Sequence, residues 1–143
     1  MQVKQISIFV ENRAGRLEEI SGVLEKENIN IRALSLADTS DFGIIRLIVN
    51  KPDAAVTALR EAGFTIRESN VIACAIEDKP GGLHRLLKLF ADLDVSIEYM
   101  YSFFERHLEK AVIIIRVEDP EEAIQILRKG GAELLKAEQI YAA

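Results

Sequence analysis

The stretch DKPGGLHRLLKLF (residues 78–90) repeats the pattern of an earlier stretch, NRAGRLEEISGVL (residues 12–24). In each stretch a glycine-containing turn leads into apolar residues that recur at helical spacing. The two turn glycines, Gly15 and Gly81, lie 66 residues apart. A turn-into-helix pattern that occurs twice in one short chain indicates an internal repeat.

The repeat extends along the chain. Ile97 follows Ile31 by the same 66 residues, whereas Pro120 follows Pro52 by 68. The two additional residues fall in a polar segment between the predicted second and third strands of the repeat. A loop tolerates such an insertion because closure entropy grows slowly with length. We infer a duplicated domain.

Each repeat has the pattern strand, helix, strand, strand, helix, strand. The strand segments alternate or are rich in β-branched residues, and the helical segments place apolar residues three and four positions apart. A βαββαβ unit folds as a four-stranded antiparallel sheet with both helices on one face, the ferredoxin-like arrangement. The sequence predicts an α+β protein of two such units in tandem, residues 1–69 and 71–143, joined at about Asn70.

Several element ends are predicted by individual residues. Pro52 begins the second helix of the first repeat, and Gly63 is placed to cap its end. Residues 64–69 are expected to form the last strand of the first repeat and residues 71–77 the first strand of the second. Residues 133–141 are expected to form the last strand of the second repeat.

The sheet face away from the helices is predicted to be apolar. If Ile45 and Leu47 face the helices, Ile44 and Ile48 point the other way. A face open to water is normally more polar, so we expect a second subunit to cover it. The alternative is a partly apolar, exposed sheet. The residues expected on this face are Leu34, Leu36, Ile44, Ile48, Met100, Phe104, Val112 and Ile114.

Composition narrows the function classes. No apolar run in the 143 residues, including the one at 111–115, approaches the roughly 20 residues of a membrane span. A formal net charge of −5 argues against nucleic-acid binding, which requires neutralisation of phosphates. The N-terminal segment lacks the features of a signal peptide, so we expect a cytoplasmic protein.

Catalytic and metal-binding groups are few. The single cysteine, Cys74, excludes an internal disulfide and a multi-thiolate metal site within one chain, and its apolar neighbours predict a buried thiol. The two histidines, His84 and His107, have no matching histidine in the other repeat and are expected on the surface. We therefore predict no catalytic residues, no metal and no cofactor.

Two longer segments, ENRAGRLEEISGVLEKENINI and EDKPGGLHRLLKLFADLDVSI, resemble the signature of the ACT domain, a small ligand-sensing module of amino-acid metabolism. The shared pattern is an Asn or Asp, an x-Pro-Gly-x-Leu turn that enters a helix, and a strand that starts like Val-Asn-Ile. The resemblance covers nearly the whole chain as a tandem pair. It implies a stand-alone regulatory protein that binds a free amino acid or similar small carboxylate, forms a homodimer and acts in trans on a metabolic enzyme.

The resemblance also implies the ligand contacts. In the first repeat they fall on Asn12, Ala14, Gly15, Arg16 and Leu17, and on Asn30, which matches a position that reaches a ligand at the interface with a neighbouring ACT domain. In the second repeat they fall on Asp78, Pro80, Gly81, Gly82, Leu83 and Ser96. Unpaired N–H groups and the positive dipole end of a helix suit a carboxylate, and an Asn or Asp can accept hydrogen bonds from an α-amino group. The alternative is that each glycine only turns the chain into its helix.

The repeats differ at these positions, so we expect unequal sites. Asp78 stands where the first repeat has Asn12, and its charge repels a carboxylate while attracting an ammonium group. Ser96 offers a shorter hydrogen-bonding group than Asn30. The site near Asn12 and Asn30 is therefore expected to be the better one. Arg16 either steers an anion or is only solvated.

The competing hypothesis is a ligand-free oligomerisation or protein-interaction module. The segment SIEYMYSFFE (residues 96–105) contains aromatic residues that the first repeat lacks. These rings either line a pocket for a bulky ligand or serve packing, as strand aromatics usually do. Binding of an amino acid would distinguish a sensor from an interaction module.

Overall fold

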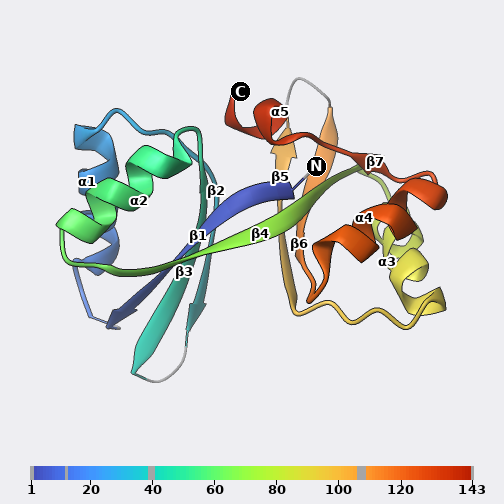
Figure 1. The fold of residues 1–143 in the computed structure, drawn as a ribbon, viewed down its shortest axis with the longest axis horizontal. Helices are drawn as coiled ribbons and strands as arrows, with labels where there is room; N and C mark the ends of the chain where they lie inside the picture. The colour runs from blue at the N-terminus through green and yellow to red at the C-terminus, as the bar shows by residue number, and fades with distance from the viewer. Residues whose placement is uncertain (1, 12, 39–40, 106–108, 143) are drawn as a thin grey trace. The chain divides into compact units, whose positions relative to one another are not determined.

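The structure is a computed structural model that describes residues 2–11, 13–38, 41–105 and 109–142 (Figure 1). It confirms the α+β class. Within the described residues, no helix is both long and apolar enough to cross a membrane. The elements are β1 (Gln2–Glu11), α1 (Arg16–Lys26), β2 (Ile31–Asp38), β3 (Phe42–Val49), α2 (Pro52–Glu61), β4 (Thr65–Ile76), α3 (Gly82–Asp92), β5 (Tyr99–Glu105), β6 (Lys110–Arg116), α4 (Pro120–Lys129), β7 (Glu133–Leu134) and α5 (Ala137–Tyr141).

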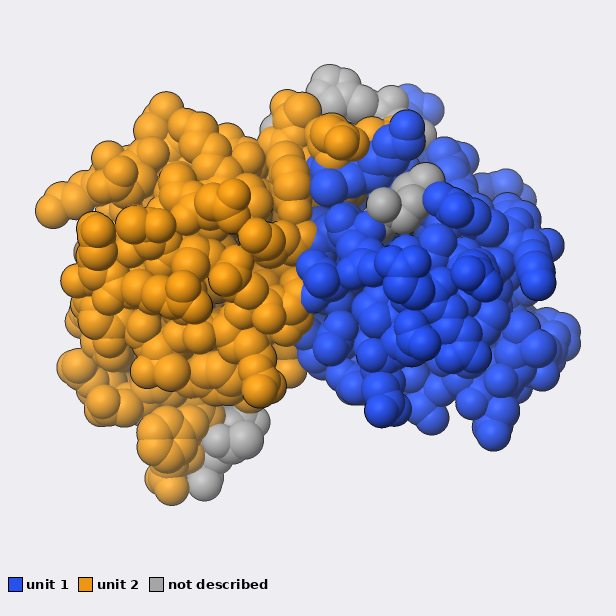
Figure 2. Space-filling model, in the orientation of Figure 1, with its two compact units in different colours: residues 1–3, 70–137 blue, residues 4–69, 138–143 orange. Residues whose placement is uncertain are grey.

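The chain divides into two compact units, shown in separate colours in Figure 2. Unit 2 holds residues 4–69 and 138–143, so it contains nearly all of the first repeat. Unit 1 holds residues 1–3 and 70–137 and contains most of the second repeat. The domain boundaries expected from the sequence repeat stay a prediction.

Each repeat uses four strands in one order. The order is β4-β1-β3-β2 in the first repeat and β7-β4-β6-β5 in the second. The expectation of two separate four-stranded sheets needs a correction, because β4 belongs to both orders and the hydrogen-bonded strands form a single seven-stranded sheet. Residues 64–69 and 71–77 were expected to form two strands, but Thr65–Ile76 is one strand, since no glycine or proline interrupts it.

The repeat is visible in the core of each unit. Ile8 on β1 lies opposite Ile45 on β3, and Cys74 on β4 lies opposite Ile113 on β6 at the matching positions. The helices cover these strands with buried residues of the same spacing, Ile20 and Leu24 from α1, and Leu86 and Phe90 from α3. Burial of each side chain of this size contributes about 1.5–3 kcal/mol, so each repeat stabilises its own two-layer packing.

Gly63 ends α2 as predicted. It has a left-handed backbone with φ of 90°, which glycine adopts without a steric penalty. Its N–H donates to the Arg60 carbonyl at 3.0 Å, and the Phe64 N–H donates to the Leu59 carbonyl at 3.0 Å. This pair of bonds satisfies carbonyls that the helix end leaves open. Gly131 repeats the arrangement after α4, with φ of 79°.

The prediction of a strand over residues 133–141 was wrong. Only Glu133–Leu134 pairs with β4, and α5 follows. The residues of α5 favour a helix, and its buried Ile140 anchors it. The Arg32 guanidinium donates from Nε to the Ile140 carbonyl at 3.0 Å, and the Lys4 N–H donates to the Tyr141 hydroxyl at 2.8 Å. Residues 138–142 are therefore held in unit 2 by tertiary contacts that local sequence did not reveal.

The prediction that a second subunit covers the apolar sheet face was wrong for three residues of that face. Ile48, Val112 and Ile114 are fully buried within the single chain, each with 0% exposure. Leu34 and Leu36, by contrast, are 55% and 53% exposed.

These exposed leucines lie on the helix side of the sheet. Leu34 pairs with Leu47 and Leu36 with Ile45, and both partners belong to the core beneath α1 and α2. Directly opposite residues of an antiparallel pair point to the same face. The same holds for Met100, which pairs with the core residue Ile115. Both edge strands, β2 and β5, therefore carry exposed apolar side chains, which also include Phe104.

Candidate ligand-binding site

The two predicted turns have the same backbone. Gly15 precedes α1 with φ of 89° and ψ of −11°, and Gly81 precedes α3 with φ of 90° and ψ of −12°. Neither helix start has a side-chain cap among the described residues. At the start of α4, in contrast, the Asp119 side chain accepts a hydrogen bond from the Glu122 N–H at 3.2 Å. The first N–H group of each helix donates to a backbone carbonyl, that of Arg16 to Arg13 and that of Gly82 to Lys79. The N–H groups that follow in the first turn have no side-chain cap and suit an external acceptor such as a carboxylate.

The turn of the second repeat is exposed except at one residue. Asp78, Pro80 and Leu83 are exposed, whereas Gly82 is buried. A Cβ atom at Gly82 would lie 2.3 Å from the Glu77 carbonyl oxygen, so the backbone leaves no room for a side chain. The sequence grouped these residues correctly at one turn, but it gave no sign that Gly82 is required by packing.

Arg16 occupies the matching position of the first repeat and is neither free nor simply solvated. Its Nη1 lies 2.8 Å from the Glu19 carboxylate, and its guanidinium carbon lies 4.9 Å from the centre of the Phe64 ring. Its Nε is buried without a hydrogen-bond partner in the described part of the chain. The neighbouring Ala14, Gly15 and Leu17 are exposed, and Asn12 lies outside the described residues.

Asn30 lies at the opposite end of α1 from Gly15. The helix has 11 residues, which at a rise of about 1.5 Å per residue separates its two ends by roughly 16 Å. One repeat therefore does not bring Asn30 and the Gly15 turn into a single site. A ligand that touches both kinds of residue must bridge two copies of the repeat or two chains.

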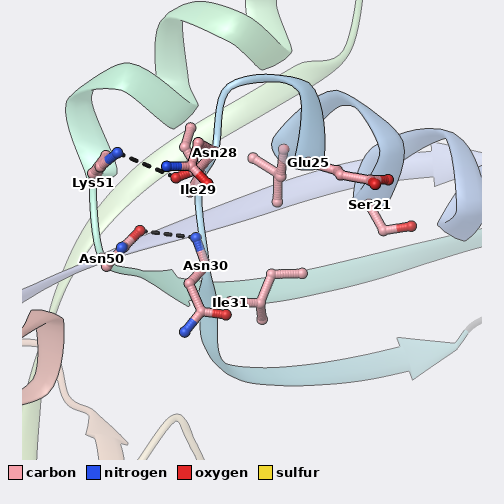
Figure 3. Close-up of a pocket in the computed structure, with 9 residues that line it drawn as sticks. Ser21, Glu25, Asn28, Ile29, Asn30, Ile31, Asn50 and Lys51 are labelled. Atoms are coloured by element: carbon pink, nitrogen blue, oxygen red, sulfur yellow. Dashed lines mark hydrogen bonds between the residues drawn. The ribbon is translucent and has the colours of Figure 1, made fainter. Parts of the chain in front are cut away.

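Asn30 borders a groove of about 430 Å³ at the C-terminal end of α1 (Figure 3). Its backbone is fixed, because its N–H donates to Asn50 Oδ1 at 2.9 Å and its carbonyl accepts from the Asn50 N–H at 3.1 Å. Figure 3 shows the Asn30 side chain pointing away from Asn50, and within the described residues this amide has no hydrogen-bond partner. Lys51 supplies a cation, and its Nζ donates to the Asn28 carbonyl at 3.2 Å.

Sequence reasoning missed Asn28, Asn50 and Lys51. These residues lie at two element ends that only the fold brings together. A left-handed backbone at Asn28, with φ of 55°, ends α1 there. Asn50 and Lys51 lie between β3 and α2. The preference of Asn for left-handed helix ends was the one local signal that could have identified Asn28.

The corresponding groove of the second repeat is acidic. It has a volume of about 490 Å³ and includes Ser96, the counterpart of Asn30. Glu118 and Asp119 stand where the first repeat has Asn50 and Lys51. The carboxylates that line this groove are Asp94, Glu98, Glu118, Asp119 and Glu122. A ligand carboxylate is repelled here by five carboxylates, whereas the Asn30 groove is lined by one carboxylate, Glu25, together with Lys51 and neutral amides.

The titratable groups give no sign of a catalytic centre. Cys74 is fully buried, as predicted, and burial raises the pKa of its thiol from 9.0 to about 12. His84 is exposed, and His107 lies outside the described residues. Among the described residues, no group of three or more His, Cys, Asp or Glu side chains is placed to hold a metal ion.

Comparison with known proteins identifies a matching family and similar solved structures. The sequence matches a family model described as an ACT domain pair over residues 1–141. Among solved structures, protein BT0572 from Bacteroides thetaiotaomicron is 40% identical, with 100% of this chain and 98% of that chain covered and a TM-score of 0.93. No curated protein matches the chain.

Two more distant structures share the fold. The regulatory subunit of aspartate kinase from Thermus thermophilus, in its ligand-free form, is 15% identical, with 89% of this chain and 91% of that chain covered and a TM-score of 0.64. The regulatory subunit of aspartate kinase from Thermus flavus is 14% identical, with 90% and 92% covered and a TM-score of 0.61. At these identities the similarity concerns the fold alone.

Proposed function

The chain belongs to the ACT domain pair family, and on that premise we propose that it senses a free amino acid or a similar small carboxylate and regulates a metabolic enzyme in trans. The supporting observation is the pair of glycine-capped helix starts, at Gly15 and Gly81, which no described side chain caps. A carboxylate docks at such N–H groups without a basic side chain. The protein performs no reaction of its own in this proposal.

Recognition of the amino group requires a second contact. The Asn30 amide suits this role because its oxygen accepts hydrogen bonds from an ammonium group and it has no partner among the described residues. Since α1 separates Asn30 from Gly15, the complete site uses Asn30 from one chain and the Gly15 turn from another. The binding protein is therefore a homodimer.

The edge strand β2 supports this dimer. It ends at the same end of the sheet as β1, which leads to the Gly15 turn, because Asp38 pairs with Gly43 and Glu11 pairs with Phe42 on the intervening β3. Two β2 edges related by a twofold axis run antiparallel, so the start of β2 in one chain lies near the turn of the other. Such pairing also covers Leu34 and Leu36, which are exposed in the single chain.

The alternative function is a ligand-free interaction module that uses the same exposed edge. The observation that favours it is the apolar surface of β2 and β5, which includes Leu34, Leu36, Met100 and Phe104. Such a surface binds another protein without any small ligand. The two functions differ in whether an amino acid stabilises the folded chain.

A thermal-shift screen of the full chain against the common amino acids and small carboxylates tests the proposal. A ligand that binds only the folded state adds about 2.7 kcal/mol at a hundredfold excess over its dissociation constant, which raises the midpoint by several degrees. Asn30→Ala is expected to remove the shift, whereas Ser96→Ala at the matching position of the second repeat keeps it. If the protein is folded and no ligand raises its unfolding midpoint, the result favours the interaction module.

A further inference from the structure

The second repeat contains a groove beside the predicted turn. Of the predicted turn residues, only Gly82 lines it. It has a volume of about 320 Å³ and lies between α3, the end of α4 and the adjoining strands, at the lower end of the size range of small-molecule pockets. Leu86, Leu89 and Ala132 give it an apolar side, and Arg85 and Lys110 give it a cationic side. The groove lies wholly within unit 1.

Two small residues of this groove stand at positions where the first repeat has large side chains. Gly82 and Ala132 line it, and the matching positions of the first repeat are Arg16 and Phe64. In the first repeat the Arg16 guanidinium lies over the Phe64 ring at 4.9 Å, and Phe64 forms part of the wall of the depression beside α1. The tight approach of the Glu77 carbonyl to Gly82 excludes a side chain there, so the backbone of the second repeat requires glycine at this position.

The charged residues of the two regions differ. Arg85 stands where the first repeat has Glu19, and the depression beside α1 is lined by Glu18, Glu19 and Glu25. Arg85 forms no ion pair within the described residues, whereas Glu19 is paired with Arg16 at 2.8 Å. A Cβ atom on Gly81 would lie 2.9 Å from Arg85 Nη1, which places the guanidinium directly at the turn.

The carboxylates near the groove already have cationic partners. Glu77 pairs with Lys79, and Glu133 pairs with Lys110. The Lys79 ammonium lowers the pKa of Glu77, with smaller contributions from Arg85 and Lys110. Glu77 and Glu133 each form an ion pair with a lysine. The Arg85 guanidinium forms none among the described residues, so it is the cation available to bind an anion.

We propose that this groove binds a small aliphatic monocarboxylate, with the carboxylate on Arg85 and the hydrocarbon part against Leu86, Leu89 and Ala132. The inference rests on the proposed sensing function and narrows it. The second repeat selects its ligand within one chain, without a residue from another subunit. The first repeat offers a different surface at the equivalent positions, because Phe64 stands there in place of Ala132 and Glu19 in place of Arg85.

Titration of the full chain with isovalerate, followed by amide chemical shifts in NMR spectra, tests the groove. We expect the amides of Gly82, Leu86 and Ala132 to shift, and the uncharged analogue isoamyl alcohol to bind more weakly. Loss of a charge-assisted hydrogen bond predicts that Arg85→Gln weakens isovalerate binding about tenfold or more. Lys88→Gln is the matched control, because it removes the same charge from an exposed position on the same helix.

A second variant tests the shape of the groove. Ala132→Phe places a ring where the first repeat has Phe64 and is expected to abolish isovalerate binding. If this variant does not fold, the comparison of Arg85→Gln with Lys88→Gln still decides. Equal affinity of these two variants, or no shift of the groove amides in the wild-type chain, overturns the proposal.

The same spectra separate the groove from the sensing function. If an amino acid shifts the amides of Gly15 and Asn30 while isovalerate leaves Gly82 and Ala132 unchanged, the sensor stands and the groove assignment fails. If isovalerate shifts the groove amides and no amino acid perturbs Gly15 or Asn30, the groove stands and the amino-acid site fails.

Discussion

The turns before α1 and α3 have the same left-handed glycine and the same helix start, yet their surroundings differ in volume and in charge. Before α1, Arg16 covers Phe64 and pairs with Glu19. Before α3, the matching positions are glycine, alanine and arginine, and a groove of about 320 Å³ is open.

This comparison shows how a duplicated domain diverges. The backbone of the turn is maintained by a glycine with positive φ and by the helix that follows it. The chemistry is set by a few side chains that pack across the turn, and these can change without altering the turn. Two copies of one fold therefore present different surfaces to a ligand.

The strongest test of the comparison is Phe64→Ala, which gives the first repeat the small residue of the second. Phe64 is 7% exposed and lies beneath Arg16. We expect a loss of about 3–4 kcal/mol in the free energy of unfolding, measured by urea denaturation, from lost burial and a new cavity. Arg16→Ala is the control and is expected to cost only about 1 kcal/mol. Equal costs would show that Phe64 stabilises the first repeat no more than Arg16 does.

Gly82→Ala makes the reverse change and adds a side chain where the second repeat has none. The new Cβ would lie 2.3 Å from a backbone oxygen, which cannot move as a flexible side chain can. We expect a loss of about 2 kcal/mol in the free energy of unfolding from the forced backbone shift. Gly22→Ala on α1, where nothing lies within 4 Å of the added Cβ, is expected to be neutral or stabilising. If Gly82→Ala leaves the free energy of unfolding unchanged, the backbone at this turn can shift at little cost.

Among the buried positions at which β1 and β4 differ, Cys74 of the second repeat matches Ile8 of the first. Burial raises the pKa of the Cys74 thiol to about 12. Its contribution to stability is therefore complete below about pH 9, the ordinary pKa of the thiol, and is lost as the pH rises toward 12.

Above the ordinary pKa of the thiol, we expect wild-type stability to fall by about 1.4 kcal/mol per pH unit more than that of Cys74→Val, which has no thiol to ionise. Urea denaturation of both proteins across this range measures the difference. Parallel pH profiles would mean that the Cys74 thiolate forms readily in the folded protein.

The smallest expected difference concerns the starts of α2 and α4. Asp119 caps α4 through the Glu122 N–H, whereas Lys51 at the start of α2 makes no side-chain cap. Asp119→Ala is expected to cost about 1 kcal/mol in the free energy of unfolding. Lys51→Ala is expected to change it by less than about 0.5 kcal/mol. Urea denaturation measures both changes. Equal losses of unfolding free energy in the two variants would show that the Asp119 cap does not stabilise α4 more than Lys51 stabilises α2.

Local patterns predicted most of the elements because they depend on neighbours in the sequence. The alternating residues of β1, the apolar spacing of α1 and the proline and glycine around α2 each act within a few residues. The repeat offset also identified the two turns correctly as equivalent. The strand predicted over residues 133–141 failed because Ile140 and Tyr141 make their contacts with Arg32 and Lys4, which are more than a hundred residues away.

The candidate site was predicted only in outline. The turn residues were grouped correctly, but Asn30 lies at the other end of α1, which no spacing rule shows without the direction of the helix. The face of Leu34 and Leu36 was assigned wrongly, because strand register depends on the partner strand and not on the strand itself.

The sequence by itself determined the duplication, the turn glycines, the order of most elements and membership in the ACT domain pair family. These follow from residue spacing and from backbone preferences that act locally. Only the tertiary structure decided that β4 serves both repeats, that Arg16 lies over Phe64, and that the groove beside α3 brings Arg85 together with Leu86, Leu89 and Ala132. The reason is that packing depends on which side chains meet across distant elements, and that meeting is a property of the fold and not of any short segment.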